Sequence, residues 1–294
     1  MKYCKIKDGV LTSNYKDELV PWWSFGKTVL ATAILKLVEN NKLDLNKKYF
    51  NNEATLFQVL RHEGGYGDYA YGSTYQRAVD AKESPWSYEE MIEKTNNQAL
   101  IFKPGTLWRY SNIGYYHLKE LIESTVKQPI TEALNQLVFH PIGLMDIRVG
   151  LFKEELLGCS YVREDYDPKW LYHGMVIGSL KSACEFLNQL SQGKIISSAS
   201  LLIMEEVYKL NFDMTGRPWQ KPGYGLGLMI DARDDEYYSY GHTGMGPDSV
   251  IGVYHFPKMK PTQTIAVISH TDNQGEVEYK IIETLNQEGN DEFI

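Results

Sequence analysis

The sequence predicts an α/β protein with an inserted helical domain, in which an antiparallel sheet is flanked by helices. Strand-like patterns lie near both ends of the 294-residue chain, helix-like patterns fill the middle, and a last helical pattern follows the final strand. We therefore expect residues 1–52 plus 212–294 to form an α/β domain with a central antiparallel sheet. Residues 53–211 are expected to form a mainly helical domain.

The N-terminal elements are a hairpin and a long helix. Asp8-Gly9 is a strong tight-turn pair between alternating side chains, which predicts a hairpin over residues 3–11. Apolar residues then recur at three- and four-residue spacing over residues 25–38, which predicts a helix. Asn40-Asn41 ends that run.

The later elements follow from the same two periods, 3.6 residues for helices and 2 for strands. The expected helices are 87–94, 113–126, 130–138, 182–190 and 276–286, and the expected strands are 224–230, 237–243, 249–256 and 264–269, with a turn at 257–261.

Composition limits the classes of partner. The net charge is −8, and acidic and basic residues are mixed along the chain, without the basic stripe that a nucleic-acid binder needs. We therefore expect a small-molecule or peptide substrate and no nucleic acid. The three cysteines, Cys4, Cys159 and Cys184, are too scattered for a disulfide framework or a zinc knuckle.

No segment of the sequence is long and apolar enough to span a bilayer, and the first residues lack the apolar stretch of a secretory signal. We therefore expect a cytoplasmic protein, or a periplasmic or secreted one if a signal was removed. A monomer is expected, with no cofactor and no metal site.

Ser24 and Lys27 are the first candidate catalytic pair. Serine needs a neighbouring base to become a nucleophile at neutral pH, and side chains three residues apart share one face of a helix. The chain contains four Ser-x-x-Lys matches, but only Ser24 precedes a long apolar helix, whose N-terminus offers amide donors and positive potential. An ordinary N-cap serine with a solvated lysine is the alternative.

Two later motifs complete the pattern. Tyr110-Ser111-Asn112 follows a turn and precedes a predicted helix. A nearby cation such as Lys27 favours loss of the tyrosine proton. His242-Thr243-Gly244 ends a predicted strand, where glycine allows a substrate backbone to approach closely. Each motif alone fits a structural role, as a helix cap or a turn.

Together, in this order, the motifs resemble those of the serine β-lactamase and penicillin-binding-protein superfamily, in the branch of class C β-lactamases, soluble DD-peptidases and related esterases. The stretches that carry the resemblance are Ser24-Phe25-Gly26-Lys27, Leu60-Arg61-His62-Glu63-Gly64-Gly65, Phe102-Lys103-Pro104-Gly105 before Tyr110-Ser111-Asn112, His140-Pro141-Ile142-Gly143-Leu144, Tyr224-Gly225-Leu226-Gly227 and Gly241-His242-Thr243-Gly244.

The resemblance implies a serine hydrolase that cleaves an amide or ester through an acyl-serine intermediate. Ser24 would be the nucleophile, and Lys27 and Tyr110 would take and return its proton. Asn112 and the His242-Thr243-Gly244 motif would bind the substrate, and the backbone N–H groups of Ser24 and Met245 would form the oxyanion hole. A DD-carboxypeptidase, a D-aminopeptidase, an esterase and a β-lactamase all fit this scheme.

A departure from the family pattern at His242 narrows the range of functions that the resemblance implies. His242 stands where β-lactamases carry lysine, so a permanent cation is replaced by a group that is largely neutral at pH 7. That weakens the case for binding a β-lactam carboxylate. A zinc peptidase is excluded because Tyr66 stands where a second histidine is needed. The remaining alternative is a non-catalytic peptide- or ligand-binding module that keeps the fold.

Overall fold

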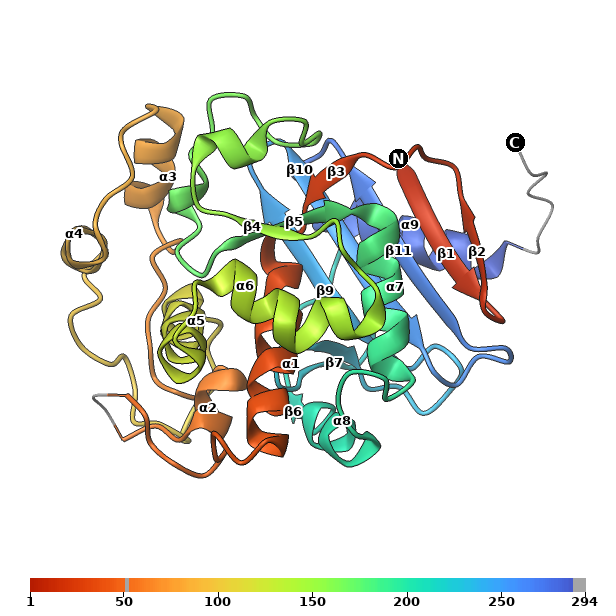
Figure 1. The fold of residues 1–294 in the computed structure, drawn as a ribbon, viewed down its shortest axis with the longest axis horizontal. Coiled ribbons are helices and arrows are strands. Elements are labelled where there is room, and N and C mark those ends of the chain that lie inside the picture. The colour runs from red at the N-terminus through yellow and green to blue at the C-terminus, as the bar shows by residue number, and fades with distance from the viewer. Residues whose placement is uncertain (51–52, 288–294) are drawn as a thin grey trace.

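The computed structural model describes residues 1–50 and 53–287, and its centre is an eight-stranded sheet in the order β2-β1-β11-β10-β9-β8-β7-β6. Every neighbouring pair of these strands is antiparallel. Helix α7 (Leu180–Ser191) and helix α9 (Gln274–Asn286) pack against the sheet. Figure 1 shows the sheet on the right and helices α3, α4 and α5 on the left. The predicted class, an antiparallel sheet flanked by helices, is confirmed.

The two ends of the chain meet in the sheet. Strands β1 (Lys2–Lys7) and β2 (Val10–Ser13) form the predicted hairpin, and both turn residues, Asp8 and Gly9, have positive φ. This is the backbone conformation that a two-residue hairpin turn needs. Strand β1 then pairs with β11 (Gln263–Ser269), near the other end of the chain.

The alternation of side chains along the central strands divides the core in two. On β10 (Ser249–Phe256), Ile251 and Val253 belong to the large hydrophobic cluster that also contains residues of α1 and α7. Val250 and Tyr254 belong to a smaller cluster with residues of α9. Successive residues of a strand point to opposite faces, so one buried strand supplies both clusters.

Helix α1 (Gly26–Glu39) connects the sheet to the helical part of the molecule. All but three of its residues are buried. It packs against α5 (Asn112–Val126), and its apolar residues share one hydrophobic cluster with residues of β10. The other helices of this part are α2 (Leu56–Leu60), α3 (Ser73–Asp80), α4 (Tyr88–Lys94), α6 (Ile130–Leu134) and α8 (Ser198–Met204). The predicted helix 130–138 ends early as α6 and continues as a π-helical turn over Asn135–Phe139.

The prediction of one strand over residues 224–230 is wrong. Strand β7 (Pro222–Tyr224) ends where it should have begun, and β8 (Met229–Asp231) starts five residues later. The chain between them bends onto α1, where the Thr28 hydroxyl donates a hydrogen bond to the Gly227 carbonyl at 2.7 Å. Gly227 has a φ of +71°, which ends the extended conformation.

A second, three-stranded sheet was not predicted. Its strands are β3 (Leu19–Pro21), β5 (Met175–Ser179) and β4 (Arg148–Gly150). Strands of three to five residues are too short to show a period in the sequence. The remaining strands of the large sheet are β6 (Tyr208–Lys209) and β9 (Ser239–Gly246).

The predicted domain division stays a prediction, and its boundary at residue 52 lies outside the described residues. Helix α7 belongs by sequence to the 53–211 segment, yet it packs against strands β1, β10 and β11. The segment therefore contributes one helix to the face of the large sheet and strand β6 to its edge.

Candidate active site

Ser24 lies in a short 3₁₀ turn, Trp23–Phe25, immediately before α1. Phe25, not Ser24, is the N-cap residue of that helix, so the alternative of an N-cap serine is not supported. Trp23 has a φ of +43°, a strained value for a bulky side chain. The Trp23 indole donates a hydrogen bond to the Ser249 hydroxyl at 2.9 Å, which helps to hold this backbone in place. Such strain is often concentrated next to reacting groups.

Lys27 is fully buried, and its amine lies among three polar atoms. The Nζ atom is 3.2 Å from the Ser24 hydroxyl, 2.6 Å from the Asn112 side-chain oxygen and 2.9 Å from Nε2 of His173. A neutral amine has two N–H groups and one lone pair. If Asn112 and His173 accept the two N–H groups, the lone pair is directed at Ser24.

Burial determines the charge of Lys27. Loss of solvation lowers the pKa of Lys27 from 10.5 to about 7, and the negative charge of Asp68 partly opposes this change. Asp68 is itself buried, which raises the pKa of its carboxyl, while hydrogen bonds from Ala70 and Asn112 act in the opposite direction. A lysine with a pKa near the working pH is suited to general-base catalysis.

Tyr110 completes the reacting triad. Its ring centre is 4.9 Å from the Lys27 amine, and its hydroxyl takes part in a hydrogen bond with Ser24 that lowers its pKa. Burial has the larger effect and raises the pKa of Tyr110 well above 10. The expectation that Lys27 favours a phenolate is therefore wrong, because loss of solvation on burial of the phenol dominates its pKa. Tyr110 is a neutral phenol that can pass a proton between Ser24 and a leaving group.

Asp68 fixes the orientation of the Asn112 side chain, which in turn contacts Lys27. Its side-chain NH₂ group donates to both carboxylate oxygens of Asp68, at 3.1 and 3.0 Å, and its backbone N–H donates to the same group at 2.9 Å. The side-chain oxygen is thereby directed at Lys27. Both ends of the predicted substrate-binding amide already have protein partners, and its contact with substrate stays a prediction.

The predicted strand motif lies directly against the nucleophile. A Cβ atom added to Gly244 would be 2.6 Å from the Ser24 backbone nitrogen, so only glycine fits there. Strand β9 pairs with β8 only up to Gly241, which leaves the following residues unpaired on that side. Met245 follows Gly244 on this edge, so the two predicted oxyanion donors belong to adjacent segments; their role stays a prediction.

His242 and Thr243 point to opposite faces of β9 and have different partners. His242 donates from Nδ1 to the Thr243 carbonyl at 2.8 Å, and its Nε2 lies 3.1 Å from the Tyr224 hydroxyl. Burial and the nearby Lys27 lower the pKa of His242 to about 3, so the ring is neutral at every working pH. His242 therefore supplies no cation to the site.

Thr243 faces α9, where it joins a charged network. Its hydroxyl donates to the carboxylate of Glu278 and lies 2.9 Å from the hydroxyl of Tyr254. Glu278 is fully buried and forms two hydrogen bonds with the guanidinium of Arg217. The Thr243 hydroxyl therefore already has two protein partners. Its predicted contact with substrate stays a prediction.

Sequence reasoning missed four residues of the site. His173 and Asp68 contact the Lys27–Asn112 pair from loops, and Arg217 and Glu278 form the ion pair beside Thr243. Only Glu278 lies in a predicted element, the helix 276–286, and no recognisable motif surrounds any of the four. The only available signal was the general rule that a buried cation or carboxylate needs a partner.

The described residues contain neither a metal-binding cluster nor a helix that could span a membrane. Over residues 1–50 and 53–287, no group of three or more His, Cys, Asp or Glu side chains could hold a metal ion. Within the same ranges, no helix has the length and apolar character needed to cross a membrane.

Comparison with known proteins agrees with this geometry. The chain is 25% identical over 308 residues to a Bacillus subtilis (strain 168) protein named as penicillin-binding protein PbpX, covering 96% of this chain and 69% of that one. It is 26% identical over 184 residues to the esterase EstB of Burkholderia gladioli, covering 55% of this chain and 46% of the esterase. The solved structure of a D-stereospecific amidohydrolase from Streptomyces sp. matches with a TM-score of 0.79 at 19% identity, covering 96% of this chain and 92% of that one.

The β-lactamase family model matches residues 8–286, which is nearly the whole chain. The motifs, the fold and this match lead to one conclusion: the chain belongs to the β-lactamase family and is a serine hydrolase of amides or esters.

Proposed function

We propose that the protein hydrolyses neutral esters or amides, which carry no free carboxylate beside the scissile bond, through an acyl-enzyme on Ser24. The neutral Lys27 amine takes the Ser24 proton, and the serine oxygen attacks the carbonyl carbon. Tyr110 returns a proton to the departing alcohol or amine. Water then attacks the acyl-serine, and the same base serves this second step.

The observation that carries the proposal is the pairing of Arg217 with Glu278. Carboxypeptidase and β-lactamase substrates present a carboxylate that needs a cation. His242 is neutral, with a pKa of about 3, and Arg217 is the one cation lining the pocket beside Tyr110 among the described residues. A substrate that took Arg217 from Glu278 would leave a fully buried carboxylate unpaired, at a cost of roughly 3–5 kcal/mol.

The names of similar proteins fit an esterase or amidase at least as well as a peptidase. They include an esterase and a D-stereospecific amidohydrolase beside a penicillin-binding protein. The non-catalytic alternative has no observation in its favour, since the three groups needed for serine acylation lie within contact of one another. A monomer is the expected active unit.

A matched pair of depsipeptides tests the substrate class. Acyl-D-alanyl-D-lactate and its methyl ester share one scissile ester and differ only in the carboxylate. We expect kcat/KM for the methyl ester to equal or exceed that for the free acid. A free acid that reacts tenfold faster would refute the neutral-substrate proposal while leaving Ser24 chemistry intact.

The nucleophile is tested separately by intact-mass measurement. After incubation with an activated ester such as p-nitrophenyl acetate, the wild-type protein should gain one acyl group and Ser24→Ala should gain none. Turnover without any role for Ser24, or an adduct that persists in Ser24→Ala, would refute the mechanism itself.

A further inference from the structure

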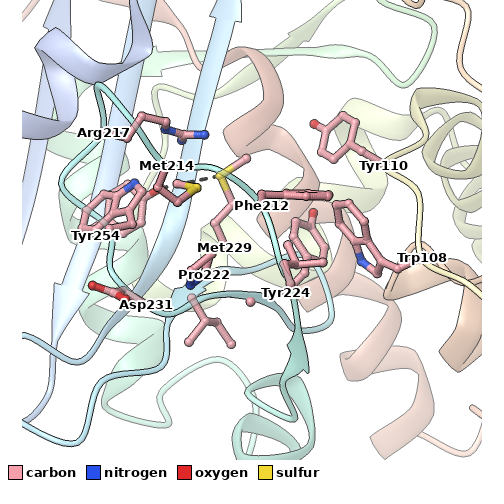
Figure 2. A pocket seen from close by; sticks show the side chains of 14 residues that line it. Trp108, Tyr110, Phe212, Met214, Arg217, Pro222, Tyr224, Met229, Asp231 and Tyr254 are labelled. Atoms are coloured by element: carbon pink, nitrogen blue, oxygen red, sulfur yellow. Dashed lines mark hydrogen bonds between the residues drawn. The ribbon is translucent and has the colours of Figure 1, made fainter.

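A cavity of about 100 Å³ opens beside Tyr110, and its walls are mostly aromatic or apolar. Trp108, Phe212 and Tyr224 form one side, with the Trp108 ring 5.6 Å from that of Phe212 and 5.7 Å from that of Tyr224. Figure 2 shows these rings on the same side of the view as Tyr110, with Arg217 and Tyr254 at the opposite end. Methionine side chains, including Met214, fill the space between the two ends.

The position of Tyr110 indicates which part of a substrate reaches this cavity. The leaving group must lie against the group that gives it a proton, and Tyr110 is that group in the proposed reaction. Its ring is covered elsewhere by His62, at 4.5 Å between ring centres, and by the Lys27 amine. Tyr110 forms part of the cavity wall, so the cavity offers space for a substrate group directly beside it.

We propose that this cavity is a leaving-group site that selects esters and amides of alcohols or amines that carry an aromatic ring. The inference rests on the proposed function, because it assigns the cavity by the direction of proton transfer. In the step concerned, the Ser24 oxygen forms a bond to the carbonyl carbon and the bond to the leaving oxygen or nitrogen breaks. The serine proton passes through Lys27 and Tyr110 to the leaving atom, so the products are the acyl-serine and a neutral alcohol or amine that carries the aromatic ring.

The walls favour an aromatic group over a small aliphatic one for two reasons. Burial of an apolar ring removes its surface from water, and ring contacts with tryptophan, tyrosine and phenylalanine add to that gain. Flexible methionines adapt to the shape of the bound ring. Full burial of a phenyl-sized group corresponds to a roughly 10- to 100-fold gain in kcat/KM.

Acetate esters separate the leaving group from the acyl group. Ethyl acetate and 2-phenylethyl acetate release aliphatic alcohols of similar acidity and give the same acetyl-enzyme, so deacylation is identical for both. We expect kcat/KM to favour the phenylethyl ester by about tenfold or more in the wild-type protein. In Phe212→Ala and in Trp108→Ala this ratio should fall to within about threefold.

Phe152→Ala is the matched control, because Phe152 is 54% exposed and Phe212 is 55% exposed, but only Phe212 lines the cavity. The control should keep the wild-type ratio. A second series, ethyl acetate against ethyl phenylacetate, varies the acyl group instead. If Phe212→Ala changes the acyl ratio and not the leaving-group ratio, the cavity holds the acyl group and the assignment is overturned.

The outcomes also separate the two proposals. If no ester is hydrolysed, the proposed function fails before the cavity is in question. If esters are hydrolysed through Ser24 without any preference for the phenylethyl group, the function stands and the leaving-group site is refuted.

Discussion

His173 offers the sharpest test of how the base is oriented. Its Nε2 atom lies 2.9 Å from the Lys27 amine, and the Asn112 oxygen lies 2.6 Å from the same atom. Two acceptors fix the two N–H groups of a neutral amine, which leaves the lone pair for Ser24. The network assigns the His173 proton to Nδ1, a buried atom without a hydrogen-bond partner among the described residues.

His173→Phe removes the acceptor and keeps a buried ring. One lost hydrogen bond is worth about 1 kcal/mol, or about fivefold in rate. Free rotation then directs the lone pair of the amine at Ser24 in only about one of three staggered positions, which lowers the rate by a further factor of about three. We therefore expect kcat/KM for p-nitrophenyl acetate to fall by roughly 15-fold. His173→Gln restores an acceptor and should recover part of the loss.

The pH profile separates orientation from general-base catalysis by His173 itself. Burial and the nearby Lys27 hold the pKa of His173 well below 6.5, so it does not titrate in the range where Lys27 does. The rise of kcat/KM with pH near pH 7 should still be seen in His173→Phe, with a lower maximum. Activity within twofold of wild type would refute the orientation argument. Loss of activity to the level of Ser24→Ala would refute it as well, because that loss indicates that His173 is the base.

Three further predictions follow from the same site. The kcat/KM of the wild type should rise with pH around a pKa of about 7, and Asp68→Asn should move this limb to lower pH because the Asp68 charge raises the pKa of Lys27. Lys27→Met should raise the free energy of unfolding in chemical denaturation at pH 7. The pKa of Lys27 is 10.5 unfolded and about 7 folded, so its burial costs on the order of a few kcal/mol below pH 7, and this cost disappears as the pH approaches 10.5. A constant difference across pH 6–10 would contradict this. Gly244→Ala should abolish esterase activity and destabilise by roughly 1–3 kcal/mol, since its Cβ would be 2.6 Å from the Ser24 nitrogen; Gly114→Ala, whose Cβ would meet no atom closer than 3.5 Å, is the control that should melt at or above the wild-type temperature.

The sequence predicted the elements whose pattern is local. The apolar spacing predicted α1, and Asp8-Gly9 predicted the hairpin, because both depend on neighbouring residues alone. The three motifs also led to Ser24, Lys27 and Tyr110, which the structure brings into contact. Their catalytic roles stay predictions until Ser24 and its partners are substituted.

The missed residues act through contacts distant in sequence. His173 is 146 residues from Lys27, and Asp68 is 44 from Asn112, so no local pattern links them. The two faces of β9 were open to prediction, because adjacent residues of a strand point to opposite sides. That rule separates His242 from Thr243 without a structure. The partner of Thr243, Glu278, was beyond reach because it lies on a distant helix.

The surroundings of Lys27 also bear on when the chain becomes able to react. Two of the three partners of its amine come from distant segments, at residues 112 and 173, and its low pKa depends on complete burial. In an unfolded or half-assembled chain this lysine is an ordinary ammonium ion, and Ser24 is as inert as any exposed serine. Acylation by an activated ester therefore reports the docking of the helical part onto α1 and the sheet, and a misassembled molecule stays unlabelled even when its secondary structure is intact.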